Sequence, residues 1–130
     1  MSILSSAENS TLDPISGTPT VVLSQTITTT GQELKLDSIA ELDIIVTLIA
    51  PYAYSILYEL REDTVAIASL TVNNEGTATS LAEPHTEIPN LTWTETPAAG
   101  SHTYDIQITL ISSTNITSVT ATTKALNIIG

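Results

Sequence analysis

The sequence predicts an all-β domain, and three observations lead to this class. From Val21 onward, short apolar runs alternate with turn signals at intervals of about eight to twelve residues, which is typical of a β-sandwich or barrel. Thr and Ser supply much of the polar surface, and the branched Cβ of Thr favours a pleated strand. The 130 residues are 42% hydrophobic but only 4% aromatic, so a single core must be filled by Ile, Leu, Val and Ala.

The strands are recognised by a side-chain period of two, which places every second residue on one face of a sheet. The clearest alternation is that of Tyr104, Ile106, Ile108 and Leu110 with the polar residues between them. Two weaker segments, residues 77–81 and 86–93, are separated by Pro84 and Pro89 and therefore belong at a sheet edge or in a crossing connection. About eight strands are expected, drawn from residues 21–28, 33–37, 42–49, 52–60, 64–72, 77–81, 86–93, 104–110 and 118–129, with residues 112–116 as a loop.

The segment 42–49 is apolar on both faces except at Asp43 and Thr47. Such a run indicates a central strand, or a strand whose outer face meets a partner. A helix over residues 38–49 is the competing interpretation, which the density of β-branched residues disfavours. Because so small a domain cannot bury every apolar residue, the surplus predicts subunit contacts on the sheet faces. The residues expected there are Ile45, Ile49, Tyr52, Tyr54, Leu126 and Ile128.

The first 18 residues differ from the rest of the chain, because Ser, Thr, Asn and Pro dominate and the apolar residues are isolated. A frayed tail is the commoner fate of such a terminus. The spaced apolar residues Ile3, Leu4, Leu12 and Ile15 favour instead an arm that docks on a neighbouring copy, either by strand addition or in a groove. The sequence therefore predicts a connector arm over residues 1–18 and a β-sandwich domain over residues 19–130.

Fourteen acidic residues against three basic ones give the chain a formal charge of −11. This charge repels phosphate backbones and anionic headgroups, so neither nucleic acid nor a membrane surface is an expected partner. The absence of cysteine excludes disulfides, thiolate metal sites and cysteine nucleophiles. The N-terminus lacks the features of a secretory signal, and no stretch approaches the roughly 20 apolar residues of a membrane span.

No arrangement of residues predicts a catalytic or cofactor-binding site, so the chain is not expected to be an enzyme. His85 and His102 fall in or beside predicted turns, at a spacing that fits no metal-binding motif, and we expect neither to bind a metal. Ser101, His102 and Asp105 are too close in sequence to converge as a catalytic triad.

Two further features carry a weak chemical signal. Asp37, Glu41 and Asp43 could offer oxygen ligands to calcium, but their order departs from the calcium-loop pattern, and solvated carboxylates beside a strand are the default. Lys124 lies in a weakly polar final strand. Its ordinary interpretation is a Lys that guards a strand edge against aggregation. The alternative is a buried Lys that forms an isopeptide bond with Asn or Asp, as in pilin-like domains, which an intact mass would reveal.

The segment TWTETPAAGSHTYDIQI, residues 92–108, combines a Trp-containing strand, a Pro/Gly turn and a Tyr-led strand, and the tail VTATTKALN follows at residues 119–127. This order resembles the jelly-roll domains of the tumour-necrosis-factor and complement-C1q-like superfamily, in the divergent form found at the ends of collagen-like bacterial spore-surface proteins. The resemblance covers roughly residues 21–130. It implies a jelly-roll β-sandwich that trimerises through flat, apolar sheet faces.

The chain departs from that superfamily because the short arm 1–18 stands in place of a collagen-like stalk. A jelly roll with a docking arm resembles the subunits of pilus-like appendages of Bacillus-type endospores. The resemblance implies a structural, self-assembling subunit of a spore-surface fibre, joined head to tail by its arm. Copies of itself are the expected partners, together with an anchor and a tip protein. The alternative is a trimeric tip or receptor-binding head of a spore nap or phage fibre, located on a phage virion in the latter case.

Overall fold

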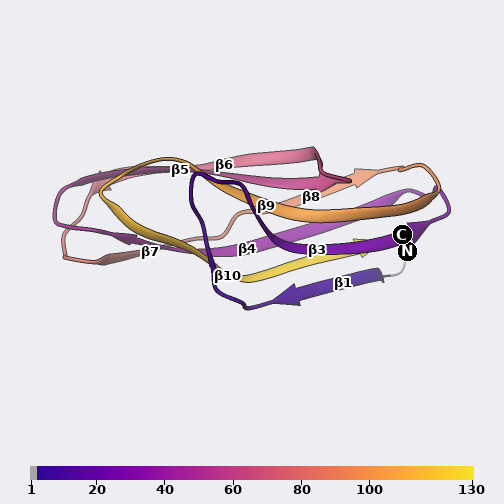
Figure 1. The fold of residues 1–130 in the computed structure, drawn as a ribbon, viewed down its shortest axis with the longest axis horizontal. Helices are drawn as coiled ribbons and strands as arrows, with labels where there is room; N and C mark the ends of the chain where they lie inside the picture. The colour runs from indigo at the N-terminus through magenta and orange to yellow at the C-terminus, as the bar shows by residue number, and fades with distance from the viewer. Residues whose placement is uncertain (1–2) are drawn as a thin grey trace.

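The computed structural model describes residues 3–130, which form two antiparallel β-sheets (Figure 1). The strands are β1 Ile3–Asn9, β2 Asp13–Pro14, β3 Thr20–Thr29, β4 Leu34–Val46, β5 Pro51–Glu62, β6 Val65–Thr77, β7 Glu83–Glu87, β8 Asn90–Glu95, β9 Gly100–Thr114 and β10 Ile116–Ile129. One sheet has the order β1-β10-β4-β7, with β2 also paired to β10 and β8 to β4, and the other has the order β3-β9-β5-β6. Among the described residues, no helix is long and apolar enough to cross a membrane.

The connections between the sheets make the sandwich a jelly roll. The strands β7 and β8 lie along successive parts of β4, so they act as one interrupted strand, and β2 is only two residues long. If β2 is omitted and β7 and β8 are counted as one, the chain has eight strands in sequence order. One sheet then has the spatial order first, eighth, third and sixth strand, and the other has the order second, seventh, fourth and fifth. Two four-stranded sheets joined in this way are an eight-stranded jelly roll, which confirms the predicted fold class.

The core lies between the two sheets and is mainly aliphatic, as the composition predicts. Along β4 and β5, every second side chain points inward and is buried. Each buried aliphatic side chain contributes about 1.5–3 kcal/mol relative to an exposed one. The largest fully buried apolar side chains are Tyr58, Tyr104, Leu34, Leu36, Leu42, Ile44, Ile56, Leu60, Ile106, Ile108 and Leu126.

Strand β4 is continuous, whereas the sequence predicts two separate strands over residues 33–37 and 42–49. Burial alternates along β4 without a break, so the whole strand has one inward face. Its central inward positions are Ser38 and Ala40, two small residues that interrupt the hydrophobic pattern. The Ser38 hydroxyl donates to the Leu91 carbonyl oxygen at 3.2 Å, so its burial is compensated. The helix considered for residues 38–49 is not formed.

Other boundaries also differ from the prediction. The expected strand over residues 86–93 is divided into β7 and β8 at Pro89, which cannot donate a ladder hydrogen bond, and both parts lie at a sheet edge as expected. Residues 78–82 form turns and bends instead of a strand. The expected loop over residues 112–116 is reduced to Asn115, which adopts a positive φ of 56° between β9 and β10.

The sequence predicts that the N-terminal segment is an arm that docks on a neighbour. In the structure this segment forms a strand in the chain's own sheet. Strand β1 pairs antiparallel with the last strand, from Ile3 opposite Ile129 to Asn9 opposite Lys124. This pairing satisfies backbone groups along the side of β10 that faces away from β4. Residues 1 and 2 lie outside the described residues.

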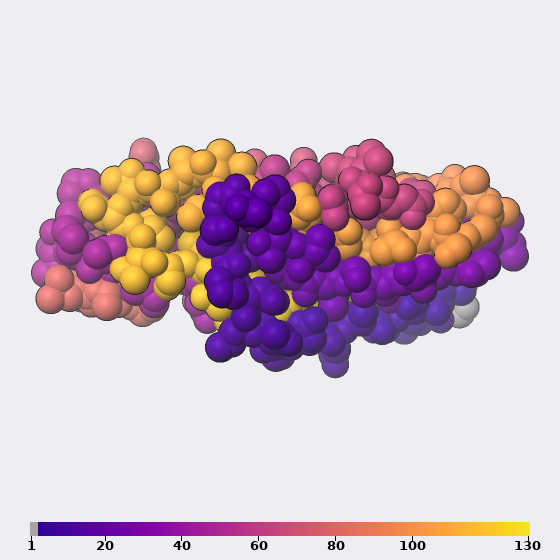
Figure 2. Space-filling view, in the orientation of Figure 1, coloured from indigo at the N-terminus to yellow at the C-terminus, as the bar shows by residue number. Residues whose placement is uncertain are grey.

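The segment after β1 joins the two sheets. The Ile15 amide donates to the Val119 carbonyl of β10, and the Leu110 amide of β9 donates to the Ser16 carbonyl, both at 2.8 Å. In Figure 2 this indigo segment rises from β1 across the side of the sandwich. Because Ile15 is also buried, residues 13–16 are integral to the domain.

Candidate functional site

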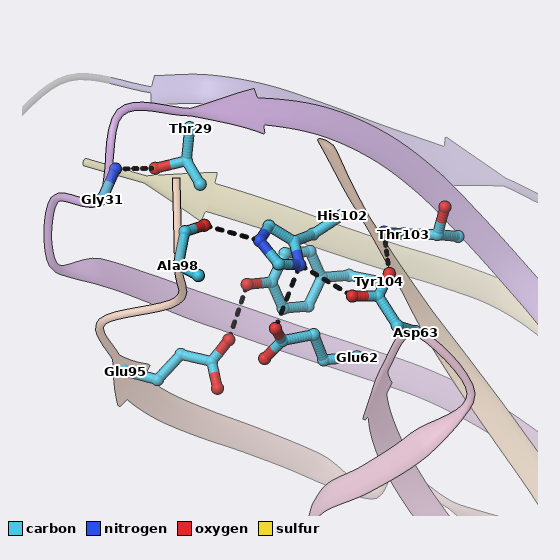
Figure 3. A network of polar contacts seen from close by, with 9 residues as sticks. All are labelled: Thr29, Gly31, Glu62, Asp63, Glu95, Ala98, His102, Thr103 and Tyr104. Carbon is cyan, nitrogen blue, oxygen red and sulfur yellow. Dashed lines mark hydrogen bonds and ion pairs between the residues drawn. The ribbon is translucent and has the colours of Figure 1, made fainter. Parts of the chain in front are cut away.

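A network of polar side chains lies at the end of the sandwich where β5 turns into β6 and β9 begins (Figure 3). Glu62 ends β5, Asp63 begins the β5–β6 turn, Glu95 ends β8, and His102 and Tyr104 lie on β9. In Figure 3 these side chains point toward one another. Two distant parts of the sequence, residues 62–63 and residues 95–104, thus meet at this end.

The β5–β6 turn consists of two residues with positive φ, Asp63 at 49° and Thr64 at 71°. This is the combination that a two-residue hairpin of type I′ requires, and it is unfavourable for a β-branched residue such as Thr64. The turn is held on β9 by two hydrogen bonds with the Thr103 backbone. The Asp63 amide donates to the Thr103 carbonyl at 2.8 Å, and the Thr103 amide donates to the Asp63 carboxylate at 2.9 Å.

His102 links this turn to the segment before β9. Its Nδ1 lies 2.7 Å from Asp63 Oδ2 and 3.2 Å from Glu62 Oε1, and its Nε2 lies 2.7 Å from the Ala98 carbonyl oxygen. Because both ring nitrogens face oxygen acceptors, the doubly protonated imidazolium is favoured. The hydrogen bond to Asp63 raises the pKa of His102, and the Ala98 carbonyl adds to this effect. The hydrogen bond from the Thr103 amide lowers the pKa of Asp63, and the hydrogen bond from His102 lowers it further.

Two carboxyl groups of the network interact directly. The hydrogen bond between Glu62 and Glu95, together with burial, raises the pKa of Glu62 to about 7. Glu62 therefore keeps its proton through the acidic range. The Tyr104 hydroxyl donates to Glu95 Oε1 at 2.6 Å, and burial raises the pKa of Tyr104 well above its usual value.

Glu62, Asp63 and His102 each offer one ligand atom, and these atoms lie within 4.8 Å of one another. Zinc accepts such imidazole and carboxylate donors. A metal at this point would have to replace the short ion pair between His102 and Asp63. The same groups are mutually satisfied as an ion-pair and hydrogen-bond network that closes one end of the sandwich, and this is the role that their contacts support.

The other candidate residues of the sequence do not join this network. His85 Nε2 lies 3.3 Å from Glu83 Oε2, and both residues lie on β7, a strand that contributes no side chain to the network. Asp105 binds Arg61 and not His102, so the three residues of the imagined triad do not converge. In the described part of the chain, the one group of side chains with metal-binding spacing does not include Asp37, Glu41 or Asp43.

The residues predicted for the arm contact are divided between surface and core. Ile3 and Leu12 are 66% and 69% exposed, and Leu4 is 40% exposed, so these three side chains are accessible to a partner. Ile15, in contrast, is buried among core residues of this chain.

The residues predicted for the sheet-face contact are divided in the same way. Ile49 is exposed, and Ile45 and Tyr52 are half-buried. Tyr54, Leu126 and Ile128 are instead core residues of this domain, because they occupy inward positions on β5 and β10. Period-two alternation identifies such a face but does not say whether a partner or the second sheet covers it.

The sequence favours Lys124 as a residue that guards a strand edge. In the structure its side chain is instead fully buried. Strand β10 is not an edge, since β1 and β2 pair with one side of it and β4 with the other. The residues around the Lys124 ammonium, and those of the Glu62 network, were not predicted from sequence. Each set comes from segments far apart in the chain, for which no local pattern exists.

No protein-family model and no curated protein matches the chain. Among solved structures, it is similar to the infectious bursal disease virus Gt strain, with 13% identity, a TM-score of 0.48, and coverage of 96% of this chain and 33% of that one. It is also similar to the infectious bursal disease virus VP2 subviral particle, with 14% identity, a TM-score of 0.46, and coverage of 96% and 32%. The Gx strain matches with 13% identity, a TM-score of 0.43, and coverage of 99% and 31%. The chain thus spans about a third of the length of these solved chains.

Proposed function

We propose that the chain is a non-enzymatic structural subunit that associates head to tail with copies of itself in an extracellular fibre. The spore surface is the location that the sequence resemblance favours, with a phage virion as the second possibility. The observation that carries the proposal is the uncovered edge strand β6.

Strand β6 is 13 residues long and, within residues 3–130, pairs only with β5, so the backbone groups on its other side have no strand partner among these residues. Its only charged residue is Glu75, and it contains no Lys, Arg or Pro. Val65 on this strand is 65% exposed. Proteins that remain monomeric usually protect edge strands with charges, prolines or short length, and an unprotected edge is a template for a further strand.

The neighbouring edge of the other sheet has the protection that β6 lacks. Strands β7 and β8 are short, Pro84 lies in β7 and Pro89 separates the two. Glu83, Glu87 and Glu95 add three negative charges. The contrast supports an intermolecular role for β6 in particular.

The complementary surface is the opposite side of the sandwich, where β1 is the edge of its sheet. Ile3, Leu4 and Leu12 are exposed there. A contact between the β1 side of one subunit and β6 of the next joins two different surfaces, so it does not close on itself and propagates as a filament. In this arrangement the arm contacts its neighbour while β1 remains paired with β10.

The net charge of −11 opposes association at long range. Salt shortens this repulsion to about 8 Å at physiological ionic strength, whereas edge pairing acts at direct contact. Assembly is therefore expected to increase with salt.

The test is electron microscopy and sedimentation of the full chain at low and physiological salt. Ser69→Lys with Thr71→Lys places two charges at exposed positions of β6, and filaments should disappear. Ser80→Lys with Ser113→Lys is the matched control, since it adds the same charge at exposed positions outside β6 and should leave filaments intact. Leu12→Ser should weaken assembly from the other side. Compact trimers, unaffected by all three variants, would overturn the fibre proposal in favour of a trimeric head.

Deletion of residues 1–18 is a poor test of this contact. It would remove Ile15 from the core and Asp13 from its ion pair with the buried Lys124. Loss of filaments could then result from loss of folding, which point substitutions at exposed positions avoid.

A further inference from the structure

The side chain of Lys124 on β10 is fully buried. Its ammonium nitrogen donates to the Thr11 carbonyl oxygen at 2.5 Å and to Asp13 Oδ2 at 2.6 Å. A buried ammonium is costly unless it is paired, so residues 11–13 supply its counter-charge and hydrogen bonds. The last strand thereby holds the segment that follows β1.

Asn9 lies beside Lys124 in the same sheet. The two residues are direct cross-strand partners, Asn9 on β1 and Lys124 on β10. Side chains of such partners project to the same face, with Cβ atoms about 4.5–5.5 Å apart. Since Lys124 points into the sandwich, the side-chain amide of Asn9 enters the same interior.

The amide oxygen of Asn9 is buried and has no hydrogen-bond partner. Nearly all buried polar atoms in folded proteins are hydrogen-bonded, so an orphaned carbonyl beside a buried amine and carboxylate requires an explanation. The three groups are a nucleophile, an electrophilic carbonyl and an acid–base group; the Lys124 ammonium is fully buried, and the Asp13 carboxylate beside it is partly exposed. These are the components of an amide-forming reaction.

We propose that Lys124 forms an intramolecular isopeptide bond with Asn9, with Asp13 as the acid–base group. Asp13 accepts a proton from the Lys124 ammonium, and the free Nζ lone pair attacks Cγ of Asn9. The new N–C bond gives a tetrahedral intermediate. Asp13 carries a second proton from Nζ to Nδ2, the Cγ–Nδ2 bond breaks, and ammonia leaves. The proton taken first departs with the ammonia as ammonium, which returns Asp13 to a carboxylate.

Asn9 is a better acceptor than Asp13, although Asp13 Oδ2 is the closer atom in the structure. The Asp13 carboxylate is the counter-ion of Lys124, and an ionised carboxylate is a poor electrophile. The Asn9 amide is neutral, and its carbonyl oxygen is not committed to another contact.

The bond would fasten the N-terminal strand to the last strand of the chain. Strand β1 is an edge strand held by one partner along its length, apart from its packing on the core. A covalent link between β1 and β10 would prevent its detachment. The link is independent of the proposed function, since it forms within one chain.

The test is the intact mass of the purified, denatured full chain, followed by peptide mapping. The expected mass is lower than that of the sequence, after allowance for removal of Met1, by one ammonia molecule. The map should contain a branched peptide that joins Asn9 to Lys124. An unchanged mass would overturn the proposal, and a mass lower by one water would overturn the choice of Asn9 in favour of Asp13.

Variants separate this bond from other reactions that release ammonia, such as cyclisation of an Asn side chain. Lys124→Arg and Asn9→Ala should each restore the full mass, while Lys35→Arg, at an exposed lysine, should retain the loss. Asp13→Asn should slow or abolish the bond. Loss of ammonia that persists in Lys124→Arg would contradict the proposal, and the branched peptide of the unmodified chain provides a test even if a variant does not fold.

Discussion

Arg61 on β5 and Asp105 on β9 are direct cross-strand partners and form a two-pronged ion pair. Arg61 Nε donates to Asp105 Oδ1 at 2.7 Å, and a terminal guanidinium nitrogen donates to Oδ2 at 2.8 Å. The side chains are only 15% and 7% exposed, and this contact raises the pKa of Arg61.

Asp105→Asn should destabilise the fold by about 2–4 kcal/mol, because it leaves the largely buried guanidinium of Arg61 without its counter-charge. Chemical denaturation of both proteins measures the difference. The double variant Arg61→Met with Asp105→Leu removes both charges and should recover most of the loss. A double variant as unstable as the single one would contradict this account.

The Glu62 network should make stability fall as pH rises. The pKa of Glu62 is raised to about 7, whereas an unfolded Glu titrates near pH 4.3, so the folded state retains a proton that the unfolded state loses. His102 acts in the same direction, since its raised pKa stabilises the fold at low pH and this contribution is lost as pH rises through the folded pKa. Asp63 acts in the opposite direction, but only at more acidic pH, because its pKa is lowered.

Glu62→Gln should therefore stabilise the protein at pH 8 by on the order of 2 kcal/mol and change little near pH 4. Thermal melts between pH 4 and pH 8 measure this, and Glu41→Gln, on the outer face of β4, is the control. Parallel stability curves for the Glu62→Gln variant and the unmodified protein would show that the folded state does not retain a proton on Glu62.

Thr64 has a φ of 71° in the two-residue turn, a conformation that costs a β-branched residue about 1 kcal/mol or more. Thr64→Gly removes this strain and should stabilise the fold by about 0.5–1 kcal/mol. Thr114→Gly, in strand β9, should instead destabilise it by a similar amount. Destabilisation by both substitutions would show that the turn is not strained.

Leu126 and Leu12 were both predicted at subunit contacts, but the structure buries the first and exposes the second. Leu126→Ala should cost about 2–5 kcal/mol of stability because it leaves a cavity in the core. Leu12→Ala should change the stability of the isolated subunit by less than about 0.5 kcal/mol. Equal effects in dilute solution would contradict the core position of Leu126.

The sequence by itself determined the fold class, the inward face of most strands and the edge position of the proline-interrupted segment. These properties follow from local alternation, as in residues 104–110, and from the inability of Pro89 to donate a hydrogen bond. The continuity of β4 was missed for an equally local reason, because Ser38 and Ala40 are small inward residues that weaken the alternation.

Only the tertiary structure decided which strand each segment pairs with and which polar groups meet. The pairing of β1 with β10, the contact of Lys124 with Asp13 and the meeting of Glu62 with Glu95 join residues that are far apart in the chain. Backbone hydrogen bonds are common to every sequence, so an extended segment such as residues 3–9 carries no local mark that distinguishes a partner in its own chain from one in a neighbour.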